Sequence, residues 1–474
     1  MKYVSTRNRL EADAVETVFR GLAPDGGLYV PEKIEKGRFE GVSSLGEAEE
    51  RVLESLFGDF PESVRKEAVS RLLSRFPAGD GVPMADVGEY TVLELFHGPT
   101  GAFKDVALSM LPVFMRHSAA GRKVLVLTAT SGDTGSAAMQ GFAGVDGTEV
   151  VVFFPEVGTS RIQRLQMTTP SAPNVHAIAI RGNFDDAQAA VKRIFADRAL
   201  AAEAEARGVY LTSANSINTG RLVPQIGYYV LASRRLLGRY GERRVCGKGI
   251  TVVVPSGNFG NLLAAYYAKL LGCPVKRFVC ASNVNDVLAR FIKSGVYEPG
   301  GGFTITNSPS MDIKKSSNVE RLVWLLSGGE DGDIENACAE TARLMSDLEK
   351  TGRYELGAKA KEKLFASFES GSATPEETEE EMRRTRVESA YVLDPHTAVA
   401  SCVARKLGLP RDGECVLVAA TATPFKFPET CAKAFGADVL GEMPPSFAEL
   451  EKLEVSQKTV IDVGMMPDTV RRFF

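Results

Sequence analysis

Three short segments rich in glycine and hydroxyl residues could bind charged groups, and the clearest one is Ser256-Gly257-Asn258-Phe259-Gly260-Asn261. It follows the apolar run 250–255 and precedes a stretch with helical periodicity. Glycines let a backbone approach an anion closely, and a helix N-terminus offers free N–H groups and the positive end of its dipole. The pattern fits a phosphate-binding loop, and by itself it fits a plain strand-to-helix turn equally well.

The second segment is Thr130-Ser131-Gly132-Asp133-Thr134-Gly135, again between an apolar run and a helical stretch. Its small hydroxyls and backbone amides could hold a carboxylate, although an ordinary N-capping turn uses the same residue types. Neither segment continues with the Lys-Ser/Thr pair of a Walker A loop, and the G-x-G-x-x-G spacing of dinucleotide-binding folds is absent from the chain.

The third segment, 96–105, reads FHGPTGAFKD and opens a helical stretch with Lys104. A lysine at such a place is usually a surface residue. At a phosphate-binding crevice of an α/β sheet, however, a lysine can form a Schiff base with an aldehyde cofactor.

Composition removes several other kinds of chemistry. The chain of 474 residues carries 56 Lys and Arg against 60 Asp and Glu, so its net charge of −4 argues against nucleic acid as a partner. Seven cysteines without C-x-x-C spacing and only four histidines predict no metal site and reduced thiols. Because no signal-peptide core or membrane-length apolar run is present, we expect a soluble cytoplasmic protein.

The elements that must position these segments alternate between apolar runs and helical stretches. We predict buried strands at 123–130, 150–154, 175–180, 250–255, 275–281 and 416–421. Apolar runs without polar alternation, separated by helices, are typical of parallel strands covered on both faces, so the fold class is open α/β. Residues 1–90 form a separate small unit, and the acidic stretch 330–388 is predicted to be a strand-free helical insertion.

Five motifs occur in a fixed order that resembles one known family. HGPTGAFKD, TSGDTG, NSIN, GNFGN and TATPFKF, together with the opening MKYVSTRN and GLAPDGGLYVP, are similar to the threonine synthases, specifically their longer form with an N-terminal domain. The resemblance covers nearly the whole chain. It implies two open twisted parallel-sheet domains of the tryptophan synthase β-like fold (fold type II) beside the N-terminal domain. The smaller lobe would span 111–212, and the larger 91–110 and 213–474.

The same resemblance implies pyridoxal 5′-phosphate as cofactor and assigns residues to it. Lys104 matches the lysine that binds the cofactor covalently and acts as the catalytic base. Gly257, Asn258, Phe259, Gly260 and Asn261 match the loop that holds the cofactor's phosphate, and Thr421 matches the hydroxyl facing the pyridine nitrogen. Asp133 stands where many relatives have asparagine near the 3′-hydroxyl of the ring.

Substrate-binding residues are expected in three places. Thr130, Ser131 and Thr134 would surround the carboxylate of the substrate, and Ser216, Asn218 and Arg221 its phosphate. Arg161 and Lys426 are further phosphate candidates, because cationic side chains suit that group; a surface ion pair remains the alternative for Arg161.

The implied activity converts O-phospho-L-homoserine and water to L-threonine and phosphate, a lyase reaction at a carbon–oxygen bond, in a monomer or homodimer. The motif that usually reads TAHPAKF has Thr423 and Phe425 in place of histidine and alanine. These changes keep open a related phospholyase that stops after elimination and releases 2-oxobutyrate, phosphate and ammonia. A nicotinamide dehydrogenase would need the missing G-x-G-x-x-G loop, and a non-catalytic scaffold would not need Lys104.

Overall fold

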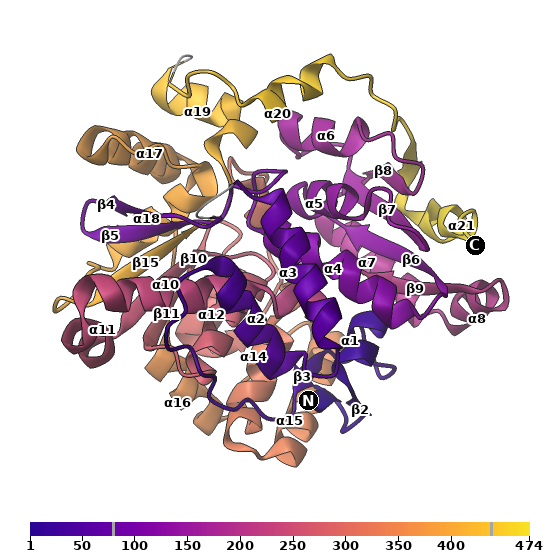
Figure 1. Cartoon of the computed structure of the whole chain (residues 1–474), viewed down its shortest axis with the longest axis horizontal. Coiled ribbons are helices and arrows are strands. Elements are labelled where there is room, and N and C mark those ends of the chain that lie inside the picture. Colours follow the sequence, from indigo (N-terminus) through magenta and orange to yellow (C-terminus); the bar gives the residue numbers. More distant parts are fainter. Residues whose placement is uncertain (78–80, 437–438) are drawn as a thin grey trace.

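The computed structural model describes residues 1–77, 81–436 and 439–474. Two sheets form the body of the molecule, each with helices on both faces (Figure 1). The five-stranded sheet is parallel throughout, in the order β16-β8-β7-β6-β9. Its strands are β6 (Lys123–Ala129), β7 (Thr148–Pro155), β8 (Val175–Arg181), β9 (Val209–Ser213) and β16 (Val460–Asp462).

The six-stranded sheet has the order β14-β11-β10-β15-β5-β4, and its strands are parallel except for the edge strand β4. Its strands are β4 (Met84–Val87), β5 (Tyr90–Glu94), β10 (Ile250–Pro255), β11 (Val275–Ser282), β14 (Phe368–Ser372) and β15 (Cys415–Ala420). The two largely parallel sheets confirm the predicted open α/β class.

Each sheet lies between two apolar layers, because successive side chains of a strand point to opposite faces of the sheet. In β6, Val124 and Val126 join the largest core cluster, whereas Leu125 and Leu127 join a second cluster on the other face. Val252 and Val253 of β10 divide in the same way. Each sheet is therefore covered on both sides, which explains why its strands lack polar alternation.

The helices that cover the five-stranded sheet come mainly from the middle of the chain. They are α4 (Lys104–Ala119), α5 (Asp133–Phe142), α6 (Arg161–Thr168), α7 (Phe184–Ala196), α8 (Arg198–Ala206) and α21 (Met466–Arg471). The helices α9 (Thr219–Leu222), α10 (Gln225–Tyr240), α11 (Glu242–Lys248), α12 (Gly260–Leu270), α13 (Val287–Ser294) and α18 (Pro395–Lys406) belong with the six-stranded sheet.

Helix α14 (Val319–Leu326) precedes the acidic region, which forms the helices α15 (Ile334–Thr351), α16 (Ala358–Ser367) and α17 (Pro375–Ser389). The chain then continues to α19 (Pro428–Phe435) and α20 (Pro445–Ala448). The prediction that 330–388 lacks strands is wrong. β13 (Tyr354–Glu355) pairs with β12 (Val296–Tyr297), and β14 is an edge strand paired in parallel with β11. The ring of Phe368 in β14 stacks on Phe278 at 5.1 Å, so this strand is stabilised by its partner more than by its own sequence.

Two strand positions also differ from the expected lobe boundaries. Residues 460–462 were expected with the larger lobe, yet β16 joins the five-stranded sheet beside β8. Residues 84–87 were expected with the N-terminal unit, yet β4 completes the six-stranded sheet beside β5. Both strands are short, and pairing across the fold decides where they lie.

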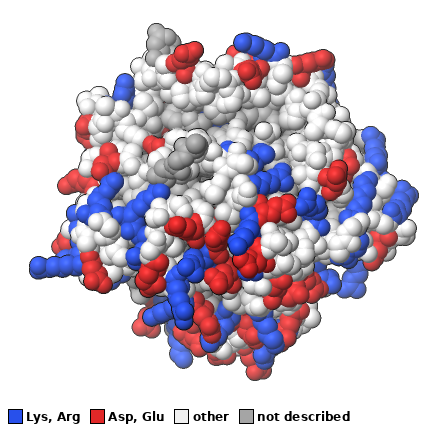
Figure 2. Space-filling model, viewed as in Figure 1, with Lys and Arg blue, Asp and Glu red and all other residues white. Residues whose placement is uncertain are grey.

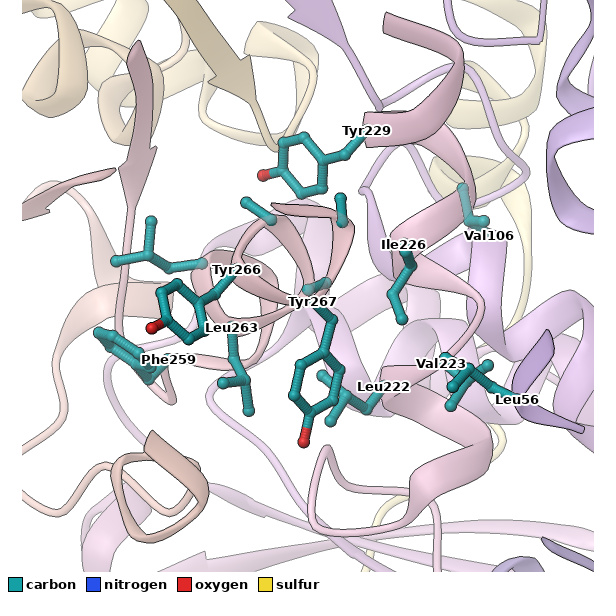
Figure 3. Packing of buried hydrophobic residues seen from close by; sticks show 14 of the residues in the cluster. Leu56, Val106, Leu222, Val223, Ile226, Tyr229, Phe259, Leu263, Tyr266 and Tyr267 are labelled. Carbon is teal, nitrogen blue, oxygen red and sulfur yellow. The ribbon is translucent and has the colours of Figure 1, made fainter. Parts of the chain in front are cut away.

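The N-terminal unit combines a small antiparallel sheet with three helices. Its elements are β1 (Tyr3–Ser5), β2 (Glu11–Ala12), β3 (Tyr29–Pro31), α1 (Ala14–Arg20), α2 (Leu45–Leu56) and α3 (Glu62–Arg75). Its apolar residues belong to the same core cluster as α10 and α12, and Figure 3 shows Leu56 beside Val223 in that core. The unit is therefore packed against the body of the molecule by a continuous core.

The surface carries both signs of charge. On the face shown in Figure 2, Lys and Arg side chains are interspersed with Asp and Glu, mostly over its lower half. Within the described ranges, no helix has the length and apolar character needed to cross a membrane.

Candidate active site

A cavity lies where loops from both sheets meet, and most of the predicted site residues line it. The lining residues that the sequence predicted are Lys104, Ser131, Asp133, Thr134, Ser216, Arg221, Gly257, Asn258, Phe259, Gly260, Asn261 and Thr421. The loops after β6 and β10 both line this cavity. They lie at the carboxyl ends of parallel strands, which is where open α/β folds bind ligands.

Lys104 is the first residue of α4 and is positioned by the turn before it. Asp105 accepts hydrogen bonds from the backbone N–H and the hydroxyl of Thr100, at 2.8 and 2.7 Å, which closes that turn. The N–H of Phe103 donates to the carbonyl of Thr421 at 2.9 Å. The start of α4 is thereby fixed to the loop after β15, so Lys104 and Thr421 face the same cavity.

The amine of Lys104 lies 3.2 Å from Oδ2 of Asp133. Burial lowers the pKa of Lys104, and the positive charges of Arg221 and Lys426 lower it further, whereas Asp133 raises it. The net direction is downward. A larger fraction of neutral amine is therefore present near pH 7 than for an exposed lysine, which suits a general base.

Asp133, at the start of α5, is a buried carboxylate surrounded by donors. Oδ1 accepts from the amine of Lys426 at 2.9 Å and from the amide of Gln163 at 2.8 Å, and Oδ2 accepts from the hydroxyl of Ser310 at 2.8 Å. Burial opposes ionisation, but the charges of Lys104 and Lys426 outweigh it and hold the pKa of Asp133 well below its usual range. The cavity thus contains a fixed negative charge beside Lys104.

The segment 257–261 leads into α12 and has the features of an anion cradle. No hydrogen bond in the described part of the chain uses the backbone N–H groups of these five residues. A Cβ on Gly257 would lie 2.7 Å from Cδ1 of Ile313 and 3.0 Å from the carbonyl oxygen of Ser310, so any larger residue would force one of these neighbours to move. These free donors lie at the positive end of the α12 dipole, which favours a bound phosphate.

Phe259 anchors this segment to the hydrophobic core. Its backbone is in the left-handed region, with φ of 63°, and its ring is buried in the core near Leu263 and Tyr266 (Figure 3). The side chain of Asn261 accepts hydrogen bonds from Tyr228 and Tyr229 at 2.9 and 2.5 Å, which leaves its buried Nδ2 without a partner among the described residues. Oδ1 of Asn258 is unpaired in the same sense. Such orphaned polar atoms are expected where a ligand completes the site.

Arg221 is a second feature of the cavity that favours binding of an anion. Its guanidinium is 2% exposed, donates to the carbonyl of Ala214 at 2.8 Å, and has no carboxylate within ion-pair distance among the described residues. Burial lowers its pKa to about 10. Because a buried cation without a counter-charge is unfavourable, a negatively charged ligand in this cavity would stabilise it.

Four predicted site residues do not line the cavity. Thr130 accepts hydrogen bonds from the N–H groups of Gly132 and Gly135 and so shapes its own loop. Asn218 caps α9 and binds the carbonyl of Val18. Arg161 is on the surface, where it pairs with Glu451. Lys426 is fully buried between Asp133 and the carbonyl of Thr100. Their residue types fit a binding role, but these four side chains make their contacts outside the cavity lining.

Two residues beside Asp133, Ser310 and Gln163, have no signal in the sequence pattern. Ser310 and Gln163 contact Asp133 directly, and the N–H of Ser310 donates to Nε2 of His396 at 3.1 Å. Nδ1 of His396 lies 2.9 Å from Asp394, so both ring nitrogens of this histidine are engaged. Ser310 lies in a long connection and Gln163 inside a helix, away from the strand-to-helix loops that the sequence marks.

Thr423, one of the two departures from the usual motif, does not line the cavity either. Its N–H donates to the carbonyl of Gly101 at 2.9 Å, and a Cβ on Gly101 would lie 2.6 Å from its Cγ2. Thr423 therefore packs against the turn that precedes Lys104.

Comparison with known proteins agrees with this geometry. The model of pyridoxal-phosphate dependent enzymes matches residues 82–352, and models of the threonine synthase N terminus and C-terminal region match 2–49 and 397–473. A threonine synthase of Pseudomonas aeruginosa is 35% identical over an alignment of 468 residues that covers 96% of this chain and 94% of that protein. The chain belongs to the threonine synthase family.

Two further similarities refine the family assignment. The crystal structure of pyridoxal-phosphate-bound threonine synthase from Brucella melitensis superposes with a TM-score of 0.86 at 34% identity and covers 100% of this chain and 99% of that one. Human threonine synthase-like 1 is 36% identical over an alignment of 450 residues that covers 91% of this chain but 59% of the human protein. The family is pyridoxal-phosphate dependent, and the cavity fits that cofactor. Lys104 would bind its aldehyde, the N–H groups of 257–261 its phosphate, and Thr421 the ring.

Proposed function

We propose that this protein is a threonine synthase, which converts O-phospho-L-homoserine and water to L-threonine and phosphate. The observation that carries the proposal is the presence of two anion-binding features in one cavity, with Lys104 beside them. The free N–H groups of 257–261 suit the phosphate of the cofactor, and the uncompensated guanidinium of Arg221 suits the phosphate of the substrate. A substrate without a phosphate would leave Arg221 unpaired.

When bound, pyridoxal phosphate supplies an electron-withdrawing ring that stabilises negative charge at the substrate α-carbon. In this proposal, Lys104 takes the proton from Cα as its amine is released, because its lowered pKa favours the neutral form. Arg221 and Ser216 hold the phosphate that leaves from Cγ. Ser131 and Thr134 orient the substrate carboxylate, and Asp133 fixes the position of the Lys104 amine.

His396 lines the cavity, but we do not propose it as a base. Its Nε2 accepts a backbone hydrogen bond from Ser310, and its Nδ1 faces Asp394. The proton transfers at Cα, Cβ and Cγ therefore fall to Lys104, and the released phosphate takes the proton of the water that adds at Cβ.

The test of the function is the identity of the product. The purified protein, incubated with pyridoxal phosphate and O-phospho-L-homoserine, should release threonine and phosphate in equal amounts. Release of 2-oxobutyrate and ammonia with phosphate would instead establish the phospholyase. The position of Thr423 outside the cavity favours the first outcome.

The variant Lys104→Ala tests the assignment of the catalytic residue. We expect loss of the visible absorbance of the lysine-bound cofactor, and a fall in threonine formation by a factor of about 10³ or more, since removal of a covalent base has such effects. The variant Lys359→Ala, exposed in the acidic region, is a control that should keep both properties. Retention of the visible band by Lys104→Ala would overturn the assignment.

We also propose that the protein works as a monomer or homodimer in the cytoplasm. Its seven cysteines are free, and six of them are buried, which suits a reducing compartment.

A further inference from the structure

Asn318 and Arg321, at the start of α14, connect three parts of the chain that lie far apart in sequence. Neither residue lines the cavity, and both side chains are completely buried. Nothing in the sequence pattern marks them, because they lie at the edge of the acidic region rather than after a strand. Their hydrogen bonds nevertheless reach two of the cavity-lining segments.

Asn318 joins the cofactor loop to the segment around Ser216. Its backbone N–H and its side-chain amide donate to the carbonyl of Asn258, at 3.2 and 3.1 Å. The same amide donates to the hydroxyl of Ser216 at 2.8 Å. One side chain therefore sets the distance between the loop that suits the cofactor's phosphate and a residue proposed to hold the substrate's phosphate.

Arg321 extends this connection to the N-terminal unit. Its guanidinium donates to the carbonyls of Ser216 at 2.9 Å, Ile217 at 2.6 Å and Tyr29 at 2.9 Å. It also donates to Oδ1 of Asn318 at 2.5 Å, which fixes the orientation of that amide. Tyr29 belongs to β3, so the N-terminal sheet contributes directly to the support of the cavity.

The burial of the Arg321 guanidinium has a free-energy cost, which indicates that its hydrogen bonds are important to the structure. No ion pair to Arg321 exists within the described ranges, although the residue is fully buried, and burial lowers its pKa to about 10. A buried guanidinium held only by carbonyls and an amide is costly to desolvate. The planar fork of arginine can bind several oxygens at fixed angles, which a lysine or an apolar residue in this place could not do.

We propose that Asn318 and Arg321 are positioning residues that hold the cofactor loop and the Ser216 segment at a fixed separation, with β3 of the N-terminal unit as their outer support. The inference deepens the proposed function but depends only on cofactor binding, so it stands whether the product is threonine or 2-oxobutyrate. It assigns the N-terminal unit a part in forming the cofactor site.

The neighbouring Glu320 provides a matched control. It accepts hydrogen bonds from Thr6 and Arg7 of the N-terminal unit but contacts neither cavity segment. Glu320→Gln therefore loosens the N-terminal unit at Thr6 and Arg7, but leaves the contact of Arg321 with Tyr29 and the cofactor loop in place. Asn318→Asp keeps the size of the side chain and its acceptor for Arg321, but replaces the donor toward Asn258 and Ser216 with an acceptor.

The experiment titrates each apo variant with pyridoxal phosphate, follows the visible absorbance to obtain Kd, and measures the Tm of the apo form and kcat and KM at saturating cofactor. For Asn318→Asp and Arg321→Met we expect Kd to rise at least tenfold and KM to rise more than kcat falls. For Glu320→Gln we expect a lower Tm with Kd within twofold of the parent.

Two results would overturn the proposal. One is an unchanged Kd in Asn318→Asp. The other is an equal rise of Kd in Glu320→Gln and Asn318→Asp, since this would reflect general loss of stability. If Arg321→Met does not fold, Asn318→Asp decides alone, and Arg321→Lys should bind cofactor more weakly than the parent protein. Formation of 2-oxobutyrate by the parent would contradict the proposed function without affecting any of these comparisons.

Discussion

At the scale of single residues, the main feature of the site is a carboxylate between two lysines. Asp133 contacts Lys104, which lines the cavity, and Lys426, which does not. The sequence predicts Lys104 as the lysine that binds the cofactor covalently, and Lys426 as a candidate for the phosphate of the substrate. A long flexible side chain can reach in many directions, so its type predicts which ligand it suits, whereas its neighbours decide where it points. Here the carboxylate and the carbonyl of Thr100 hold Lys426 inside the protein.

Replacement of Lys426 by methionine should affect both stability and pH dependence. Loss of one partner from a buried pair costs about 3 kcal/mol of unfolding free energy, measurable by guanidinium denaturation. Burial lowers the pKa of Lys104 and the charge of Lys426 lowers it further, so loss of that charge should raise the pKa. The acid limb of the kcat/KM profile should then move to higher pH.

Lys452→Met, on the exposed surface, serves as the control for that experiment and should change neither quantity. A Lys426→Met protein with parental stability and an unshifted acid limb would show that the pair with Asp133 has no role.

At the scale of elements, the strands formed by continuous apolar runs were the elements best predicted from the sequence. β6, β7, β10 and β15 are rich in valine and leucine, and the loops after them gave Ser131, the 257–261 loop and Thr421. β14 reads FESGS and has one large apolar residue, so its pairing depends on β11 already being in place. Ser310 was missed for a related reason, because its position follows from how a long connection packs and not from a local pattern.

The turn before α12 depends on a glycine, and Gly257→Ala should weaken cofactor binding. The added methyl group would meet Ile313 and the carbonyl of Ser310, at 2.7 and 3.0 Å, so the loop or the opposite segment must move. We expect Kd for pyridoxal phosphate to rise about tenfold, which corresponds to about 1.4 kcal/mol.

Gly302→Ala is a suitable comparison in the same titration, because a Cβ at that position meets nothing within 4 Å. If both substitutions left Kd unchanged, the loop would have more freedom than its contacts indicate.

At the scale of the whole molecule, the N-terminal unit is part of the body and not an appendage. Its helix α2 packs on α10, and the carboxyl group of Glu49 is buried in that contact without a hydrogen-bond partner among the described residues. A Cβ on Gly227 of α10 would lie 2.3 Å from Oε1 of Glu49, so the two helices approach closely there. Burial raises the pKa of Glu49 well above its ordinary value.

Glu49→Gln should therefore stabilise the protein in a pH-dependent way. A raised folded-state pKa contributes stability below the unfolded pKa of about 4.3, and that contribution is lost as pH rises through the folded pKa. The variant should gain at least about 1.4 kcal/mol more at pH 8 than at pH 4.5, the value of one pKa unit.

Urea denaturation at the two pH values measures this difference, with Glu50→Gln on the exposed side of α2 as the control. A gain of equal size at both pH values would mean that Glu49 is already ionised in the folded protein, so that its pKa is not raised.

The position of β16 has a consequence for synthesis on the ribosome. Arg181 at the end of β8 and Asp462 at the end of β16 are 281 residues apart. At about 5–20 residues per second, β8 emerges roughly 15 seconds to one minute before the strand that covers it. During this interval the outer edge of β8 would present unpaired N–H and carbonyl groups at Ala179–Arg181, the three residues that later pair with β16. The growing chain is thus most open to wrong pairing, and most in need of a chaperone, until β16 is translated.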